Sequence, residues 1–177
     1  MNIYGGKTTL QIEETAFEGV KLIRLNGFED HRGEYVELYN HELYKQNGIA
    51  IDFVEDDIST ASYGVLKGIH GDTQTWKLIS CLHGKFYLVV VNNEPLSHNY
   101  GKWISFVLSE RNKLQVLVPP NHGNGHLCLS KKSIFHYKQS SYYSENKDHQ
   151  FTIKWDDPFF NIWWPITNPI LSRRDEC

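Results

Sequence analysis

Two basic side chains stand close together in a part of the chain that is rich in β-forming residues. His70 ends the segment Lys67–His70, and Lys77 follows in the next apolar run. Aimed into a barrel, the imidazole can accept a proton and the ammonium group can stabilise an anion. The alternative is that neither side chain has a function: His70 would be a polar residue at the end of a strand, and Lys77 a lysine exposed to solvent. Alternation places Lys67 with Ile69 on one face and His70 on the other, and the strand of Lys77 is close enough to pair as a hairpin.

An aromatic run and the end of the chain offer a proton donor and a carboxylate. Tyr137 lies in a β-rich run, and Tyr143 follows six residues later. A strand tyrosine that faces a pocket can act as a general acid. The alternative is that its ring packs in the core or at its edge while its hydroxyl contacts solvent. Asp175 lies where disorder is common, so it can orient a histidine only if the tail is tied down. The Trp/Pro-rich segment 163–165 could do that.

The segment 119–125 holds two prolines and two glycines, which predicts a rigid, irregular loop. His122 and His126 are four residues apart, a spacing that suits metal ligands on a helix, which this loop cannot form. Metal-binding barrels of the cupin type show His-x-His, but His70 is followed by Gly71 and Asp72. We therefore expect no metal site.

Composition narrows the class of protein. The chain has 177 residues, 40% hydrophobic and 22% charged, with a net charge of -3, which predicts one folded domain over residues 1–177. Without a basic excess, nucleic acid is not an expected partner. No apolar run reaches the ~18 residues of a membrane helix, and the first fifteen residues do not read as a signal peptide. Three cysteines without a CxxC pair indicate reduced thiols and a cytoplasmic protein.

Short strand patterns with Gly/Pro/Asn turns dominate the chain, which predicts an all-β fold, a β-sandwich or jelly-roll barrel. Residues 41–47 are the one plausible short helix, ended by Gly48. Residues 86–91 are apolar on both faces, so we expect that strand to be covered on both sides. The expected strands are Val20–Leu25, Glu34–Tyr39, 49–59, Tyr63–Ile69, Trp76–Leu82, Phe86–Val91, Lys102–Leu108, Leu114–Val118 and Ser133–Lys138.

Several separate motifs occur in a characteristic order over residues 20–175. They are Phe28–Glu37, Gly64–His70, Lys77–Ile79, Tyr100–Trp103, Leu108–Pro119, Tyr137–Tyr143, Trp155–Pro158, Ile162–Pro165 and Leu171–Asp175. Together they resemble the dTDP-4-dehydrorhamnose 3,5-epimerase family of nucleotide-sugar epimerases. The resemblance implies a cupin-type jelly roll with short flanking helices, a homodimer, an active site in the barrel, and neither metal nor cofactor.

The resemblance also implies roles for individual residues. His70 matches the base that removes a proton beside the ketone, and Asp175 matches the carboxylate that pairs with it. Tyr137 matches the acid that returns a proton from the other side, and Lys77 matches the cation near the C4 oxygen. The implied substrate-binding residues are Arg32 and Lys67 around the diphosphate, Tyr35 and Glu37 beside the base and often from the partner subunit, and Asn124 and Tyr143 near the sugar.

The chain departs from the family pattern in the loop after the prolines. The usual loop histidine is replaced by Asn124, which can donate a hydrogen bond but cannot carry a proton, and Asp72 stands where the family often has Gln. This variant loop resembles the branch that acts on GDP-linked 4-keto-heptoses for bacterial capsular polysaccharide.

Two other functions fit the same barrel. A sugar 3,4-ketoisomerase would move the carbonyl instead of inverting a carbon. A sugar-binding cupin without activity would have lost its chemistry through the loop changes. The retained set of base, cation, acid and carboxylate argues for an enzyme, because a binding module has no need of an opposed acid and base.

Overall fold

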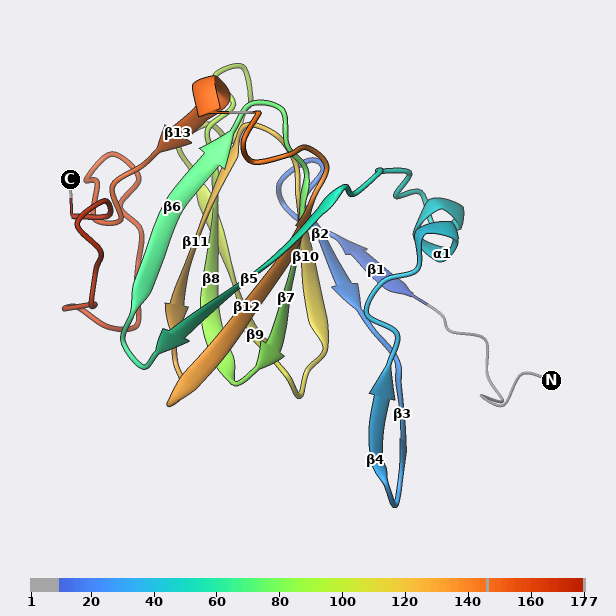
Figure 1. Ribbon diagram of the computed structural model, residues 1–177. Helices are drawn as coiled ribbons and strands as arrows, with labels where there is room; N and C mark the ends of the chain where they lie inside the picture. The colour runs from blue at the N-terminus through green and yellow to red at the C-terminus, as the bar shows by residue number, and fades with distance from the viewer. Residues whose placement is uncertain (1–9, 146, 177) are drawn as a thin grey trace.

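Two antiparallel β-sheets face each other, and a separate two-stranded hairpin projects from them (Figure 1). The computed structural model describes residues 10–145 and 147–176. Cys177 and residues 1–9, which include most of the segment judged not to be a signal peptide, lie outside them. The arrangement confirms the predicted all-β jelly roll with short flanking helices. Within the described residues, no helix is long and apolar enough to cross a membrane.

The larger sheet has six strands and the smaller has five. The six-stranded sheet runs in the order β1 (Gln11–Glu14), β2 (Lys21–Arg24), β10 (Leu114–Val118), β7 (Lys77–His83), β12 (Lys132–Gln139) and β5 (Glu55–Ser62). The five-stranded sheet runs in the order β13 (Gln150–Thr152), β6 (Leu66–Asp72), β11 (His122–Cys128), β8 (Lys85–Asn92) and β9 (Trp103–Ser109). The remaining elements are the hairpin strands β3 (Gly27–Asp30) and β4 (Gly33–Val36), helix α1 (His41–Gln46) and the 3-10 turn η1 (Lys147–His149).

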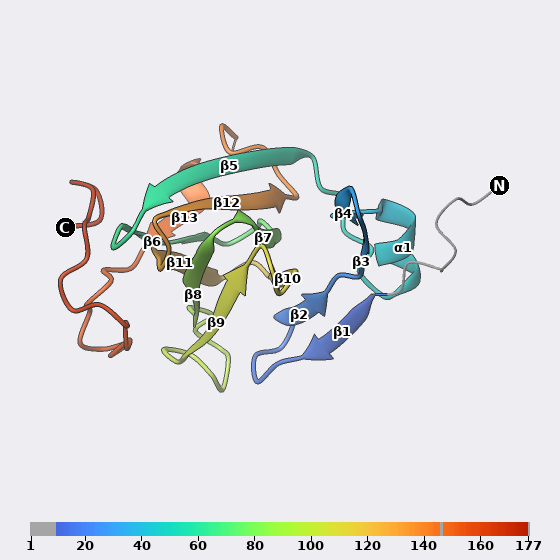
Figure 2. The ribbon, with the colours of Figure 1, turned by 90° about the horizontal axis from the view of Figure 1, so that it is seen from below.

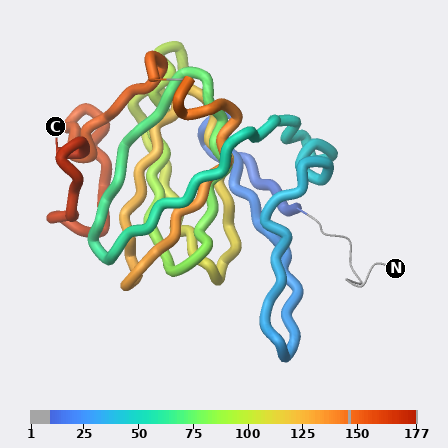
Figure 3. Tube along the Cα trace, in the orientation of Figure 1, coloured from blue at the N-terminus to red at the C-terminus, as the bar shows by residue number. Residues whose placement is uncertain are grey.

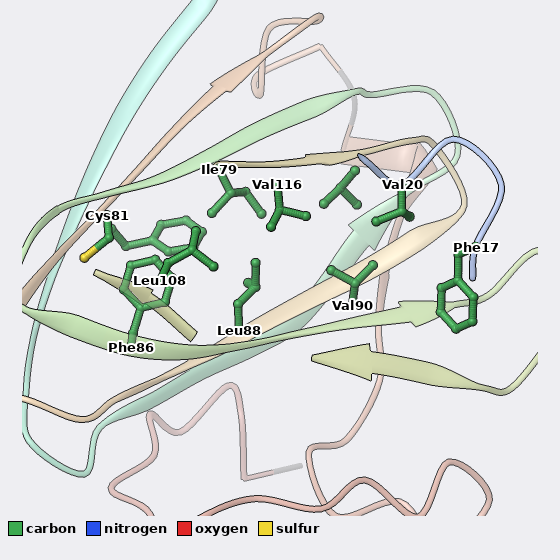
Figure 4. Packing of buried hydrophobic residues seen from close by; sticks show 11 residues of the cluster. Phe17, Val20, Ile79, Cys81, Phe86, Leu88, Val90, Leu108 and Val116 are labelled. Atoms are coloured by element: carbon green, nitrogen blue, oxygen red, sulfur yellow. The ribbon is translucent and has the colours of Figure 1, made fainter. Parts of the chain in front are cut away.

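The main core lies between the two sheets (Figure 4). Strand β8 contributes Phe86, Leu88 and Val90 to this core, and all three are fully buried. Its alternate residues Tyr87 and Val89 face outward into a second cluster, which the C-terminal segment covers. The prediction that this strand is covered on both faces is therefore confirmed.

The C-terminal segment and helix α1 cover opposite outer faces of the sandwich (Figures 1 and 2). Trp164 is buried on the five-stranded sheet, and its Nε1 donates to the carbonyl of Trp155 at 2.9 Å. Helix α1 begins after Asn40, whose side chain accepts a hydrogen bond from the Leu43 amide, and it buries Tyr44. The predicted helix over 41–47 is thus present and ends one residue earlier.

The predicted irregular loop over 119–125 is wrong in its second half, because β11 begins at His122. The glycines of this strand serve close packing rather than a turn. A Cβ atom on Gly123 would lie 2.6 Å from the side chain of Ile69, and one on Gly125 would lie 3.0 Å from it. Glycine inside a strand permits such an approach, so a feature of packing imitates a turn signal.

The expected hairpin between the strands of His70 and Lys77 is also wrong. Strand β6 pairs with β11 and β13, whereas β7 pairs with β10 and β12. The two strands therefore belong to opposite sheets. Their side chains meet across the interior instead of side by side along one sheet.

A β-bulge interrupts β6 between Lys67 and His70. Lys67 is opposite His126 and His70 is opposite Asn124, so three steps along β6 match two steps along β11. An extra residue on one strand shifts its alternation. Lys67 and His70 consequently both line one cavity, whereas strict alternation predicts that they lie on opposite faces.

The bulge predicts that Gly68 tolerates no side chain. A Cβ atom there would lie 2.6 Å from the Cα of Gly125 and 2.7 Å from the carbonyl oxygen of Asn124, both backbone atoms. We expect Gly68→Ala to lower the free energy of unfolding by about 1–3 kcal/mol more than Gly64→Ala does. Gly64 is the matched control, since it also has a positive φ but no atom within 4 Å of its added Cβ. Urea denaturation of both variants measures the difference, and equal losses would contradict the close approach.

Candidate active site

A cavity of about 270 Å³ opens between the two sheets. Side chains from both sheets form its wall, so groups can approach a bound molecule from two sides. The six sequence-predicted residues that line it are Lys67, His70, Lys77, Asn124, Tyr137 and Tyr143. The fold therefore gathers these residues from β6, β7, β11, β12 and the segment after β12, which belong to three separate regions of the sequence.

His70, which lines the cavity, contacts the buried carboxylate of Asp175, which does not line it. His70 Nε2 lies 2.8 Å from Asp175 Oδ1, and the Asp175 side chain is only 5% exposed. A carboxylate at this distance holds the proton on Nε2, which leaves the lone pair on Nδ1. Thr152 Oγ1 lies 3.2 Å from Nδ1. The nitrogen that could accept a proton thus already contacts the hydroxyl of a residue on the neighbouring strand β13.

The C-terminal tail is held against the strand that carries His70. The amide of Leu66 donates to the Ile170 carbonyl at 3.0 Å, and the Ile170 amide donates to the Gly64 carbonyl at 2.8 Å. Asp175 Oδ2 then accepts a hydrogen bond from the Ser172 hydroxyl at 2.8 Å. These contacts hold the tail against β6 and place the Asp175 carboxylate beside His70.

The surroundings of His70 keep its imidazole neutral. Burial lowers the pKa of His70, and the nearby charge of Arg174 lowers it further. The Asp175 carboxylate acts in the opposite direction and raises this pKa, but the net change is downward. A neutral imidazole is the form that can accept a proton, so the site suits a general base at neutral pH.

Tyr137 is in the opposite protonation regime. Burial raises the pKa of Tyr137 to about 12, and the neighbouring Asp57 carboxylate adds to this shift. Tyr137 is directly opposite Asp57 in the pairing of β12 with β5, so the two side chains lie on the same face of the sheet and the carboxylate acts on the phenol. The phenol therefore stays protonated at neutral pH and can serve as a proton donor.

Two lysines bring positive charge to the cavity. Lys67 donates to the Ser59 hydroxyl at 2.6 Å and to the Thr60 carbonyl at 2.9 Å. Burial lowers the pKa of Lys77, while Asp72 partly offsets that shift. A partly desolvated ammonium group interacts more strongly with a developing anion than one in water does.

The structure does not bring the other three predicted binding residues to this cavity. Arg32, Tyr35 and Glu37 lie on or just after the β3–β4 hairpin, which projects away from the sandwich (Figures 1 and 3). Arg32 pairs with Asp30 at 2.6 Å and is largely exposed. None of the three lines the cavity of its own chain.

Three residues at the site are not predicted by the sequence patterns. Asp57 and Arg174 act on Tyr137 and His70, and His126 lines the cavity beside Asn124. The signal for His126 was its offset of two from Asn124, which puts both on one face of a strand. That signal was lost because the segment was interpreted as a loop. Among the described residues, no group of three His, Cys, Asp or Glu side chains is arranged to hold a metal ion.

Comparisons with known proteins agree with this arrangement. The family model described as dTDP-4-dehydrorhamnose 3,5-epimerase matches residues 14–177. The enzyme of that name from Escherichia coli (strain K12) is 35% identical over 172 residues, which cover 94% of this chain and 92% of the relative.

Solved structures show the same fold. The dTDP-4-dehydrorhamnose 3,5-epimerase of Bacillus anthracis, with TDP and PPi bound, has a TM-score of 0.90 at 33% identity and covers 95% of this chain and 97% of its own. The Legionella pneumophila dTDP-6-deoxy-D-glucose-3,5-epimerase, in complex with dTDP-4-keto-L-rhamnose, has a TM-score of 0.88 at 32% identity, with 94% and 89% covered.

The charges around His70 predict opposite pKa shifts for two neighbouring substitutions. We expect Asp175→Asn to lower the pKa of His70, because the carboxylate that raises it is lost, and Arg174→Gln to raise it. Titration of the imidazole signals by NMR measures both, with the His70 signal assigned by its absence in His70→Asn. Asp72→Asn, in the same cavity but not among the groups that shift His70, is the control. Shifts of the same sign in both tail variants would contradict the assigned contacts.

Proposed function

The chain belongs to the dTDP-4-dehydrorhamnose 3,5-epimerase family of isomerases, and we propose that His70 and Tyr137 invert C3, or both C3 and C5, of its nucleotide-linked 4-keto sugar. One observation carries this mechanism. A neutral imidazole on β6 and a protonated phenol on β12 line the same cavity from opposite sheets. Inversion needs a base on one face of a carbon and an acid on the other, and this arrangement supplies both.

In the first step His70 removes the hydrogen beside the C4 ketone as a proton. The electron pair of the C–H bond moves toward the carbonyl, and the C4 oxygen becomes an enolate. Such a C–H bond is too weakly acidic for imidazole alone, so the enolate must be stabilised. Lys77 supplies a positive charge and Asn124 a hydrogen-bond donor for this oxygen. Asp175 stabilises the imidazolium that forms.

In the second step Tyr137 donates its phenol proton to the same carbon from the opposite face. The carbonyl re-forms and the configuration is inverted. The tyrosinate left behind has a strong tendency to regain a proton, because the pKa of Tyr137 is raised to about 12. The chemistry needs only these side chains, and we propose that neither metal nor cofactor takes part.

We further propose a homodimer in which the β3–β4 hairpin reaches the partner's cavity. The hairpin carries Arg32 and Tyr35 away from the cavity of its own chain, and it exposes Phe28 and Tyr35 to 48% and 54%. Large exposed aromatic side chains on a projecting arm favour burial against another surface. An arm exchanged between two subunits would bring a guanidinium group to the diphosphate.

We propose the nucleotide and the sugar from the variant residue in strand β11. Asn124 replaces the usual loop histidine, which supports GDP-linked 4-keto-heptose as the substrate, used for capsular polysaccharide in the cytoplasm. Cys81 and Cys128 are buried free thiols, in keeping with a reducing compartment. The names of the relatives described above contain dTDP or TDP.

Thermal unfolding in the presence of GDP, dTDP, UDP or CDP tests the choice of nucleotide, because a bound nucleotide stabilises the fold by mass action. We expect GDP to raise the midpoint of unfolding most, and a larger increase with dTDP would contradict the proposed substrate.

Tyr137→Phe should separate proton exchange from inversion. His70 can still remove and return a proton on one face, so solvent deuterium should enter the substrate at C3 or C5. Loss of the general acid should slow formation of the epimer by at least about 10²-fold. NMR in D₂O follows both processes, and Tyr143→Phe is the control in the same cavity. Inversion at the parent rate would show that Tyr137 is not the acid, and migration of the carbonyl would indicate a ketoisomerase.

Mixed dimers should reveal the exchanged hairpin. We expect His70→Asn and Arg32→Ala each to have low activity alone. In a dimer with one copy of each, one cavity has both defects and the other has none. In a 1:1 random mixture about half of the dimers are mixed, and each mixed dimer has one intact cavity out of two. The mixture should therefore recover about a quarter of the parent activity. Activity no greater than the average of the two variants would show that the hairpin does not serve the partner.

A further inference from the structure

His126 is a buried polar side chain that the proposed reaction leaves unused. It lies on β11, is 4% exposed, and lines the same cavity as His70 and Lys77. Its Nε2 atom is buried and has no hydrogen-bond partner among the described residues. A buried polar atom without a partner destabilises the folded protein, so a ligand that pairs with it would gain free energy.

Two aromatic rings hold His126 in place. Its imidazole stacks on Phe135, with ring centroids 4.0 Å apart and an interplanar angle of 8°. Phe86 lies at a centroid distance of 5.4 Å from the same ring. Packing of this kind restricts rotation of the ring, so its nitrogen atoms have defined directions before any ligand binds. Preorganised groups lose less entropy on binding than flexible ones.

Asn124 extends the same polar surface. It lies two residues before His126 on β11, so both side chains are on one face of the strand. Its Oδ1 atom is also buried without a partner among the described residues. The two residues are opposite His70 and Lys67 in the pairing of β11 with β6. His70 therefore lies beside two buried polar atoms, Asn124 Oδ1 and His126 Nε2, that have no hydrogen-bond partner among the described residues.

The imidazole of His126 is neutral at physiological pH. Burial lowers its pKa to about 3, and the nearby Lys67 and His70 add to the shift. A neutral imidazole presents one donor and one acceptor. It suits a sugar hydroxyl or carbonyl oxygen, whereas it would not attract the diphosphate, which the lysine and arginine side chains are suited to bind.

We propose that His126 is a specificity-determining residue that hydrogen-bonds an oxygen of the sugar beside the base. This inference rests on the proposed function, because it takes a nucleotide sugar as the ligand. An apolar substituent against His126 would leave its nitrogen unpaired, and the site should therefore discriminate against it. We expect neither the diphosphate nor the nucleobase of the nucleotide to contact this side chain.

His122 provides a matched control on the same strand. It is buried to a similar extent, at 7% exposure, and its Nε2 atom is likewise without a partner among the described residues. His122 does not line the cavity, and its Nδ1 atom lies 3.0 Å from the Pro120 carbonyl. A general effect of replacing a buried histidine in β11 should appear at both positions, whereas an effect on sugar binding should appear only at His126.

Calorimetric titration of full-length protein tests the proposal. The probes are GDP, dTDP, UDP or CDP, whichever stabilises the parent most, and the 4-keto-heptose linked to that nucleotide. Titrations use a His70→Asn background, so that binding is measured without turnover. We expect His126→Phe, which keeps the stacking on Phe135, to weaken the sugar nucleotide about tenfold and the nucleotide alone by less than about twofold. His122→Phe should change neither affinity.

A second variant guards against misfolding. His126→Gln keeps a donor and an acceptor without the ring, and it should retain more of the sugar affinity than His126→Phe. The proposal is overturned if His126→Phe leaves the affinity for the sugar nucleotide unchanged, or if it weakens the nucleotide alone equally. These affinities do not depend on turnover. Absence of epimerisation in the parent enzyme would contradict the proposed function and would be seen separately.

Discussion

The contact between His70 and Asp175 is the interaction on which the rest of the site depends. It joins a strand of the five-stranded sheet to the second-last described residue of the chain, with 2.8 Å between the His70 nitrogen and the Asp175 carboxylate oxygen. The contact exists because the segment around Ile170 continues along the start of β6. The aromatic residues before it, with Trp164 buried on the outer face of the sheet, hold that segment in place. Packing on the outside of the sandwich thus positions the base inside it.

Burial then assigns the acid and base roles. The same desolvation lowers the pKa of His70 and raises the pKa of Tyr137, because in each case it disfavours the charged form. Histidine consequently becomes a ready acceptor and tyrosine a retained donor at one pH. Asp175 acts on His70 from the C-terminal tail, and Asp57 acts on Tyr137 from β5. Burial thus separates the protonation states of the two groups; Asp57 adds to the shift of Tyr137, whereas Asp175 opposes the shift of His70 without reversing it.

The jelly-roll topology places these groups on facing walls. Strands β6 and β11 bring His70, Asn124 and His126 from one sheet, while β7 and β12 bring Lys77 and Tyr137 from the other. The close approach of β6 and β11, made possible by glycine, aligns the first wall. The hairpin with Arg32 lies outside this frame, so the single chain forms the chemical centre and leaves the outer part of the site to another surface.

The sequence by itself determined the elements whose signals are local. Alternating and two-sided apolar patterns predicted the jelly roll and the doubly covered strand 86–91, and the order of the motifs indicated the family and the pairing of His70 with Asp175. Only the tertiary structure decided which residues share a wall. Lys67 joins His70 because a bulge forms against β11, and His126 enters the cavity because a glycine-rich segment packs as a strand on Ile69. Both depend on contacts between segments more than fifty residues apart, and no local pattern in either segment encodes such contacts.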